Sequence, residues 1–181
     1  MDVRWAAPAV DREDAQRYLN RLRRRSLFSP MRWFARSPLQ RRLELVYLPC
    51  RVILFSAERS DVEGFILVNG FARQAQAVRG QLPAVSEPNG LLHFEYPLSD
   101  ANSLEIARKA FLSWKLGRVA GGKLDSAHFV VGGLLNYPFW AQYVESQSGR
   151  ISLDLLDAVT GKPGGVMMKQ ALLEAMKGEP R

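Results

Sequence analysis

The sequence predicts an α+β fold of two related units, each a helix followed by antiparallel strands, with an additional C-terminal helix. The first observation is a repeat, because the same order of patterns occurs around 11–70 and again around 102–158. The second is the alternation of helical periodicities with short strand patterns, which is typical of the α+β class. The third is the composition, with 47% apolar and 24% charged residues, which is that of a globular protein.

The repeat is marked by prolines within strand patterns and by the turn residues that follow them. Pro138 follows Pro49 by 89 positions, and Asp157 follows Asn69 by 88, so one single-residue gap aligns the two copies. Each unit of a repeat must bury its apolar face against its neighbour. We therefore expect two units, which divide the chain into residues 1–90 and 91–181.

The first unit opens with a predicted helix. Residues 1–9 look like a flexible arm, and Asp11 then offers an N-cap. An apolar stripe follows at helical spacing, and the helix should end near Ser26 because Ser29-Pro30 disfavours helical geometry. The stripe consists of Ala15, Tyr18, Leu19 and Leu22.

Strands and a linker complete the first unit. The stretch 80–90 holds two prolines and a closing Asn-Gly, which indicates a linker. A short strand near Leu91–Tyr96 could belong to either unit. The other predicted strands are 43–48, 51–57, 62–69 and 71–78.

The second unit repeats this order. Asn102 is the predicted N-cap of its helix, with Glu105 at the third helical position. The buried stripe is Leu104, Ala107, Phe111 and Trp114. Strands are predicted at 127–135, 139–146 and 150–156, and a final helix at 166–177.

The positive charge of the chain is concentrated in one segment. The formal net charge is +7, and nine arginines with no acidic residue lie between Arg17 and Arg42, so the rest of the chain sums to about −2 (7 minus 9). This asymmetry makes the segment a candidate interaction site. The candidate binding residues are Arg17, Arg21, Arg23, Arg24, Arg25, Arg32, Trp33, Arg36, Arg41 and Arg42.

Four interpretations of this Arg-rich segment are open. It could hold an acidic protein partner, with Trp33 as an exposed anchor. It could lie on an anionic membrane surface, or bind nucleic-acid phosphates while its aromatic rings stack on bases. Alternatively, the arginines only solvate a helix and cover apolar surface with their stems. The pattern favours a protein partner or a membrane over nucleic acid, and it predicts a non-catalytic accessory or scaffold module.

No set of residues identifies a reaction, so we expect neither enzymatic activity nor a cofactor. Gly117–Lys123 has the spacing of a phosphate-binding loop, but Leu124 replaces the required Ser or Thr, and a helix precedes it. Cys50 is expected to be a small buried hydrophobe. His93 and His128 lack a third orienting group at recognisable spacing, and no pair of residues has metal-ligand spacing. A ligand-binding or enzymatic cavity between helix and sheet remains an alternative.

The sequence also predicts where the protein resides. Its start is polar, so a secretory signal peptide is not expected. The longest apolar run, Phe129–Ala141, is interrupted by glycine and proline and is too short to span a bilayer. We therefore expect a cytoplasmic protein, which could be peripheral to a membrane. With a single cysteine, it cannot form an intramolecular disulfide.

The second unit resembles a known repeat. The matching residues are Ala107 and Ala110 on the helix, Trp140 and Tyr143 on the middle strand, and the closing Asp157–Lys162 segment. They resemble the PepSY-type repeat, a small helix-plus-sheet module often found in tandem and in extracytoplasmic or membrane-linked proteins. In the first unit, only Tyr47–Pro49 and Val68–Gly70 match.

The resemblance implies a non-catalytic binding or inhibitory module, with no catalytic residues to carry over. The chain departs from the pattern in two ways, since it lacks a predicted signal peptide and adds the Arg-rich segment. Trp140 and Tyr143 are three positions apart, so they must either point to opposite faces of the strand or flank a bulge.

Overall fold

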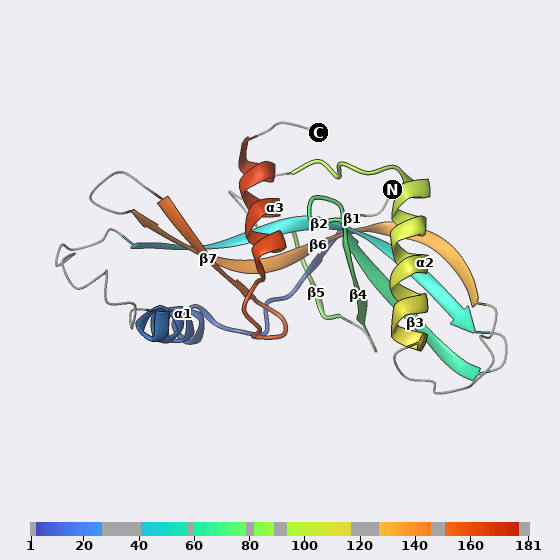
Figure 1. Cartoon of the computed structure of the whole chain (residues 1–181), viewed down its shortest axis with the longest axis horizontal. Coiled ribbons are helices and arrows are strands. Elements are labelled where there is room, and N and C mark those ends of the chain that lie inside the picture. Colours follow the sequence, from blue (N-terminus) through green and yellow to red (C-terminus); the bar gives the residue numbers. More distant parts are fainter. Residues whose placement is uncertain are drawn as a thin grey trace.

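The computed structural model describes residues 3–26, 41–57, 60–78, 82–88, 94–116, 127–145 and 151–177. Within them the chain forms three helices and one mixed sheet of seven strands, which confirms the predicted α+β class (Figure 1). The helices are α1 (Arg12–Ser26), α2 (Asp100–Leu116) and α3 (Val166–Lys177). The strands are β1 (Val3–Ala6), β2 (Arg41–Ala57), β3 (Ser60–Asn69), β4 (Gln74–Val78), β5 (Ala84–Val85), β6 (Ala127–Glu145) and β7 (Ile151–Asp157).

Two long strands form the centre of the sheet. β2 and β6 pair antiparallel along their lengths, with Leu48 opposite Tyr137. The strand order is β4-β3-β2-β6-β1-β5, and β7 also pairs with β6. Since β2 lies in the first predicted unit and β6 in the second, the two units contribute to one sheet. The unit boundary at residue 90 remains a prediction.

The two outer hairpins have equivalent registers. Cys50 pairs with Asn69 in the β2–β3 hairpin, and Phe139 pairs with Asp157 in the β6–β7 hairpin. These equivalent residues are 89 and 88 positions apart, the offsets of the aligned repeat. The pattern is that of a pseudo-twofold axis normal to the sheet at the centre of the β2–β6 pair. A duplication as its origin remains a prediction.

Strand breaks predicted beside Pro49 and Pro138 are wrong, because β2 and β6 run continuously through both prolines. On its outer edge β2 pairs with β3 only from Cys50 onward, and β6 pairs with β7 only from Phe139 onward. Pro49 therefore lies just before β2 gains β3, and Pro138 lies in the gap between the β1 ladder, which ends at Asn136, and the β7 ladder, which begins at Phe139. A proline has no N–H to donate, and it is tolerated where the adjacent edge has no ladder.

α1 begins as predicted. The Asp14 N–H donates to the Asp11 carboxylate at 2.8 Å, so Asp11 is the N-cap. Ala15 and Leu19 are fully buried and pack in one cluster with Trp140. Although α1 comes from the first unit, it lies against β6 and β7 of the second.

α2 begins three residues earlier than predicted. Ser99 is the N-cap, since its hydroxyl accepts the Asn102 N–H at 3.3 Å, so the prediction of Asn102 as the cap is wrong. Ala107 and Phe111 pack in a cluster with Ile53 of β2, as their stripe predicts. α2 comes from the second unit and lies against β2, β3 and β4 of the first. Each helix therefore covers the hairpin of the other unit.

α1 and α2 use the same face of β2. α1 packs on Leu43 and Leu45, and α2 packs on Ile53 and Phe55. All four residues have odd numbers, and alternate residues of a strand point to the same face. Long strands twist, and this face turns along the sheet. Leu43 and Leu45 lie near the start of β2, and Ile53 and Phe55 lie near its end, so the two helices lie at opposite ends of an elongated molecule (Figure 1).

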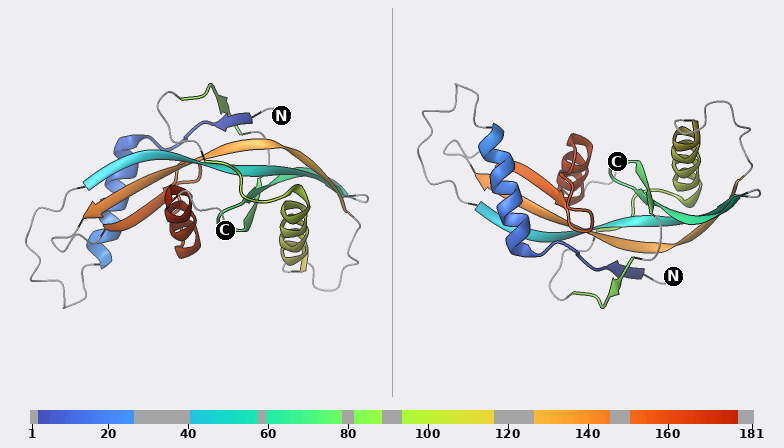
Figure 2. Two further views of the ribbon diagram at one scale, coloured as in Figure 1. Left: turned by 90° about the horizontal axis from the view of Figure 1, so that it is seen from above. Right: turned by 90° about the horizontal axis from the view of Figure 1, so that it is seen from below.

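α3 lies on the other face of the sheet, against β7. Leu172 and Ala175 of α3 pack in one cluster with Leu48 and Cys50, which alternate with the residues under α1 and α2. The bounds of α3 confirm the helix predicted at 166–177. Figure 2 shows the curvature of the sheet, with β1 and β5 on its convex side.

Two further predictions are corrected. Residues 1–9 are not simply an arm, because Val3–Ala6 forms β1, which pairs parallel with β6 and antiparallel with β5. Trp5 of β1 is buried edge-on to Tyr47, with ring centroids 5.0 Å apart. The described part of the strand predicted near Leu91–Tyr96 is not a strand. Among the described helices, none is long and apolar enough to cross a bilayer.

Candidate functional site

The ten candidate binding residues fall into two groups. The side chains of six lie outside the described residues: Arg23, Arg24, Arg25, Arg32, Trp33 and Arg36. The remaining four, on α1 and at the start of β2, are exposed: Arg17, Arg21, Arg41 and Arg42. We call these four the basic end. Arg41 joins the two elements, because its guanidinium donates to the Asn20 side-chain oxygen on α1 at 2.9 Å.

Two of the four arginines of the basic end form ion pairs, and both pairs are largely exposed. Arg17 is 71% exposed and pairs with Asp14 at 2.7 Å, and Arg42 is 79% exposed and pairs with Glu44. Arg21 forms no ion pair with the part of the chain that the structure describes. Ion pairs this exposed contribute about 0–1 kcal/mol. An external anion could therefore compete for these guanidinium groups.

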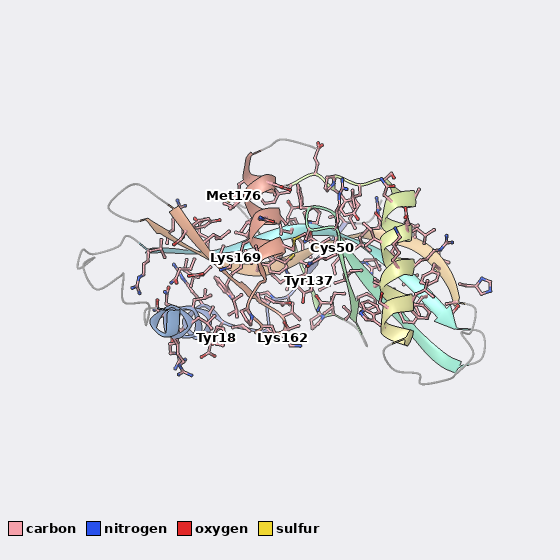
Figure 3. The ribbon with its side chains drawn as sticks, viewed as in Figure 1. Tyr18, Cys50, Tyr137, Lys162, Lys169 and Met176 are labelled. Carbon is pink, nitrogen blue, oxygen red and sulfur yellow. The ribbon has the colours of Figure 1, made fainter. Side chains whose placement is uncertain are left out.

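A second candidate site lies at the pseudo-twofold axis, on the face that α3 covers. A pocket of about 380 Å³ is lined by residues of six elements and of the loop after β7. Cys50 and Tyr137 lie near the middle of the sheet, and Lys162 lies on that loop (Figure 3). We call it the central pocket. Its volume is in the range of small-molecule sites.

Asp157 organises one wall of the central pocket. The Tyr137 hydroxyl donates to both carboxylate oxygens, at 3.0 and 3.1 Å. The N–H groups of Val159 and Thr160 donate to Oδ1 at 2.9 Å, so Asp157 closes a turn where β7 ends. Gly161 completes this turn with a φ of +68°, which glycine adopts without strain.

Asn69 is the equivalent residue in the other hairpin. Its side-chain oxygen likewise accepts a turn N–H, from Ala72 at 2.9 Å. Asn69 lines the central pocket with only 6% of its surface exposed, and its Nδ2 has no hydrogen-bond partner. The two hairpins thus end in equivalent polar turns, one of which leaves a buried donor unused.

Two hydrogen-bearing groups of the pocket, the Cys50 thiol and the Tyr137 hydroxyl, are held neutral. Burial, reinforced by the charge of Asp157, raises the pKa of the Cys50 thiol to about 12. Burial and Asp157 also raise the pKa of Tyr137. Since the thiolate is the reactive form of cysteine, Cys50 is unreactive at neutral pH. The prediction that Cys50 is a buried hydrophobe is confirmed.

The other candidate chemistry gains no support from geometry. His128 lies at an exposed position of β6, and His93 lies outside the described residues, as does Gly117–Lys123. Within the described ranges no three His, Cys, Asp or Glu side chains gather as a metal site would require.

The residues of the PepSY resemblance occupy defined places. Trp140 packs under α1, whereas Tyr143 packs on the opposite face, where its hydroxyl meets the Met176 sulfur at 3.3 Å. Trp140 and Tyr143 therefore point to opposite faces of β6, and no bulge separates them. Comparisons with family models, curated proteins and solved structures found no match for this chain. The resemblance accordingly remains a prediction.

Proposed function

We propose that the protein is a non-catalytic accessory or scaffold module that binds an acidic partner protein through its Arg-rich segment, residues 17–42. The observation that carries the proposal is the exposure of the basic end, where Arg17 and Arg42 keep more than two thirds of their side-chain surface in solvent (71% and 79%). The proposal includes a cytoplasmic location.

The contrast between the two helices supports an external role for this charge. α1 carries six arginines and two carboxylates (6 minus 2, +4), and α2 carries three basic residues and two carboxylates (3 minus 2, +1). They cover equivalent hairpins, so packing does not call for the higher charge. Arginines late in α1 also suit the helix dipole, but that effect is only about 0.3–1 kcal/mol.

A binding titration with matched variants tests the proposal. The probe is a fluorescent oligoglutamate peptide, and its anisotropy reports binding. Arg17→Glu/Arg21→Glu on α1 and Arg108→Glu/Lys109→Glu on α2 both lower the net charge from +7 to +3 (7 minus 4). We expect the α1 variant to lose most of the affinity and the α2 variant to keep most of it. Equal losses in both would contradict a site at the basic end.

The other ligand classes are outcomes of the same titration. Vesicles that contain phosphatidylserine and a DNA oligonucleotide replace the peptide in parallel runs. Association with vesicles but not with the peptide would assign the segment to a membrane surface. Tight DNA binding with a steep salt dependence would assign it to nucleic acid.

A further inference from the structure

The central pocket provides an inference that is independent of the proposed function. Its floor is apolar, since Leu67, Phe139 and Met168 line it and belong to the cluster beneath α3. Its polar groups lie around this floor and come from both hairpins and from the start of α3. Such a combination of an apolar surface and a few polar groups is typical of sites for small organic molecules.

The first polar group is the unpartnered amide of Asn69. Its Nδ2 is buried and has no hydrogen-bond partner, although its oxygen is used by Ala72. A buried donor without a partner is unfavourable, because it has given up its hydrogen bonds to water and gained none in the fold. A ligand that brings an acceptor oxygen to this nitrogen would supply the missing hydrogen bond.

The second polar group is the N-terminus of α3, a helix of 12 residues. The Gly165 carbonyl accepts the Lys169 N–H at 3.1 Å, which makes Gly165 the N-cap. The first N–H groups of a helix have no intrahelical partner, and a glycine has no side chain to accept from them. Gly165 and Met168 place this helix end in the wall of the pocket, where it favours a negatively charged ligand.

Two charged side chains narrow the choice of ligand. Lys162 lines the pocket from an exposed position and adds a positive charge. Asp157 adds a negative charge, although both of its oxygens already accept the Tyr137 hydroxyl. The negative charge of Asp157 repels a multiply charged anion such as phosphate. The Asn69 amide and the N–H groups at the start of α3 nevertheless need a ligand that carries an acceptor oxygen.

We propose that the central pocket binds a small organic monocarboxylate. The ligand's oxygens accept from Asn69 Nδ2 and from the N–H groups at the start of α3, and Lys162 compensates its charge. The ligand's carbon chain lies on Phe139, Leu67 and Met168. The proposal is one of binding alone, with the thiol of Cys50 and the hydroxyl of Tyr137 both protonated.

The test is an NMR titration of the full chain with hexanoate, with hexanol and inorganic phosphate as comparison probes. We expect hexanoate to shift the side-chain amide of Asn69 and the backbone amides at the start of α3. Hexanol should bind at least about tenfold more weakly, because a hydrogen bond to a charged group contributes about 1.5–3 kcal/mol. Phosphate should cause no saturable shift at these groups.

Two variants separate binding from folding. Asn69→Asp keeps the acceptor for the Ala72 N–H but replaces the free donor with a carboxylate, so hexanoate binding should be lost. Gly165→Val places a side chain at a residue that lines the pocket, where a new Cβ would meet no atom within 4 Å, so it should weaken hexanoate binding without a clash inside the fold. Asn102→Asp, at an exposed position of α2, is the control for the chemical change and should bind hexanoate normally.

The outcomes are distinct. Hexanoate binding that is lost in Asn69→Asp, weakened in Gly165→Val and retained in Asn102→Asp would support the proposal. Equal binding of hexanol, or unchanged binding in Asn69→Asp, would overturn the role of the amide. Equal binding of phosphate would overturn the carboxylate assignment, and absence of any hexanoate shift in the folded protein would overturn the site itself.

Discussion

α1 and α2 lie at equivalent places about the pseudo-twofold axis, yet they bury different side chains. α1 packs Ala15 and Leu19 against a tryptophan, Trp140. α2 brings Phe111 into an aromatic group, with ring centroids 5.2 Å from Phe55 and 5.4 Å from Phe129. The place of each helix is therefore set by its apolar stripe and by the hairpin beneath it, while the size of the packing residues can vary.

The two ends also use arginine differently. At the α2 end, Arg51 is only 8% exposed, pairs with Asp100 at 2.8 Å and lies over the Tyr96 ring. It ties the start of α2 to the sheet. At the α1 end, Arg17 and Arg21 point away from the core. The same residue type thus supports the fold at one end and remains available to solvent at the other.

The largest expected effect is on the two helix stripes. Leu19→Ala and Phe111→Ala should each lower the free energy of unfolding by about 2–5 kcal/mol, because each leaves a cavity in a buried cluster. Since both helices pack on one sheet, urea denaturation should show a single transition for each variant. Two separate transitions would show that the two ends of the sheet fold independently.

The next effect is on stability at alkaline pH. It concerns Cys50, which can lose a proton, whereas the equivalent residue of the other hairpin, Phe139, cannot. The pKa of the thiol is about 9 when exposed and about 12 in the folded protein, so above pH 9 the unfolded chain loses this proton first. Stability should therefore fall as the pH rises from 9 to 12, by about 1.4 kcal/mol per pH unit from this group. Urea denaturation across this range should give a shallower decline for Cys50→Ala. An identical slope would contradict the burial of the thiol.

A smaller effect on stability is expected from replacing the buried Arg51 or the exposed Arg17. Arg51→Met should lower the free energy of unfolding by about 1–3 kcal/mol, since it removes a buried partner of a charged group. Arg17→Met should change it by less than about 0.5 kcal/mol, as is usual for exposed positions. Thermal unfolding of both variants measures the difference. Equal losses would mean that Arg17 also supports the fold.

Local features of this fold could be predicted from the sequence. The Asp11 cap, the Ala15 and Leu19 stripe and the limits of α3 follow from patterns within about a dozen neighbouring residues. The cap of α2 was misplaced because Ser99 and Asn102 are both good capping residues, and the choice depends on where the helix meets Arg51 of the sheet.

Features that depend on distant partners could not be predicted. Pro49 and Pro138 suggested strand ends, and only the position of the outer strands explains why β2 and β6 continue. β1 pairs Trp5 with Asn136, a contact that no local pattern announces.

The central pocket shows the same limit. Alignment of the repeat had marked Asn69 and Asp157 as equivalent, which is the one signal that could have led to the site. The unused amide of Asn69, however, follows from which groups surround it in the fold.

The central claim is that the charge of the basic end is not needed by the fold. The most direct test is the free energy of unfolding of Arg17→Glu/Arg21→Glu, measured by urea denaturation beside Arg108→Glu/Lys109→Glu. We predict that each variant stays within about 1 kcal/mol of the natural protein, because exposed charges contribute little. A loss of more than about 2 kcal/mol in the α1 variant alone would show that these arginines stabilise the fold and would contradict the account.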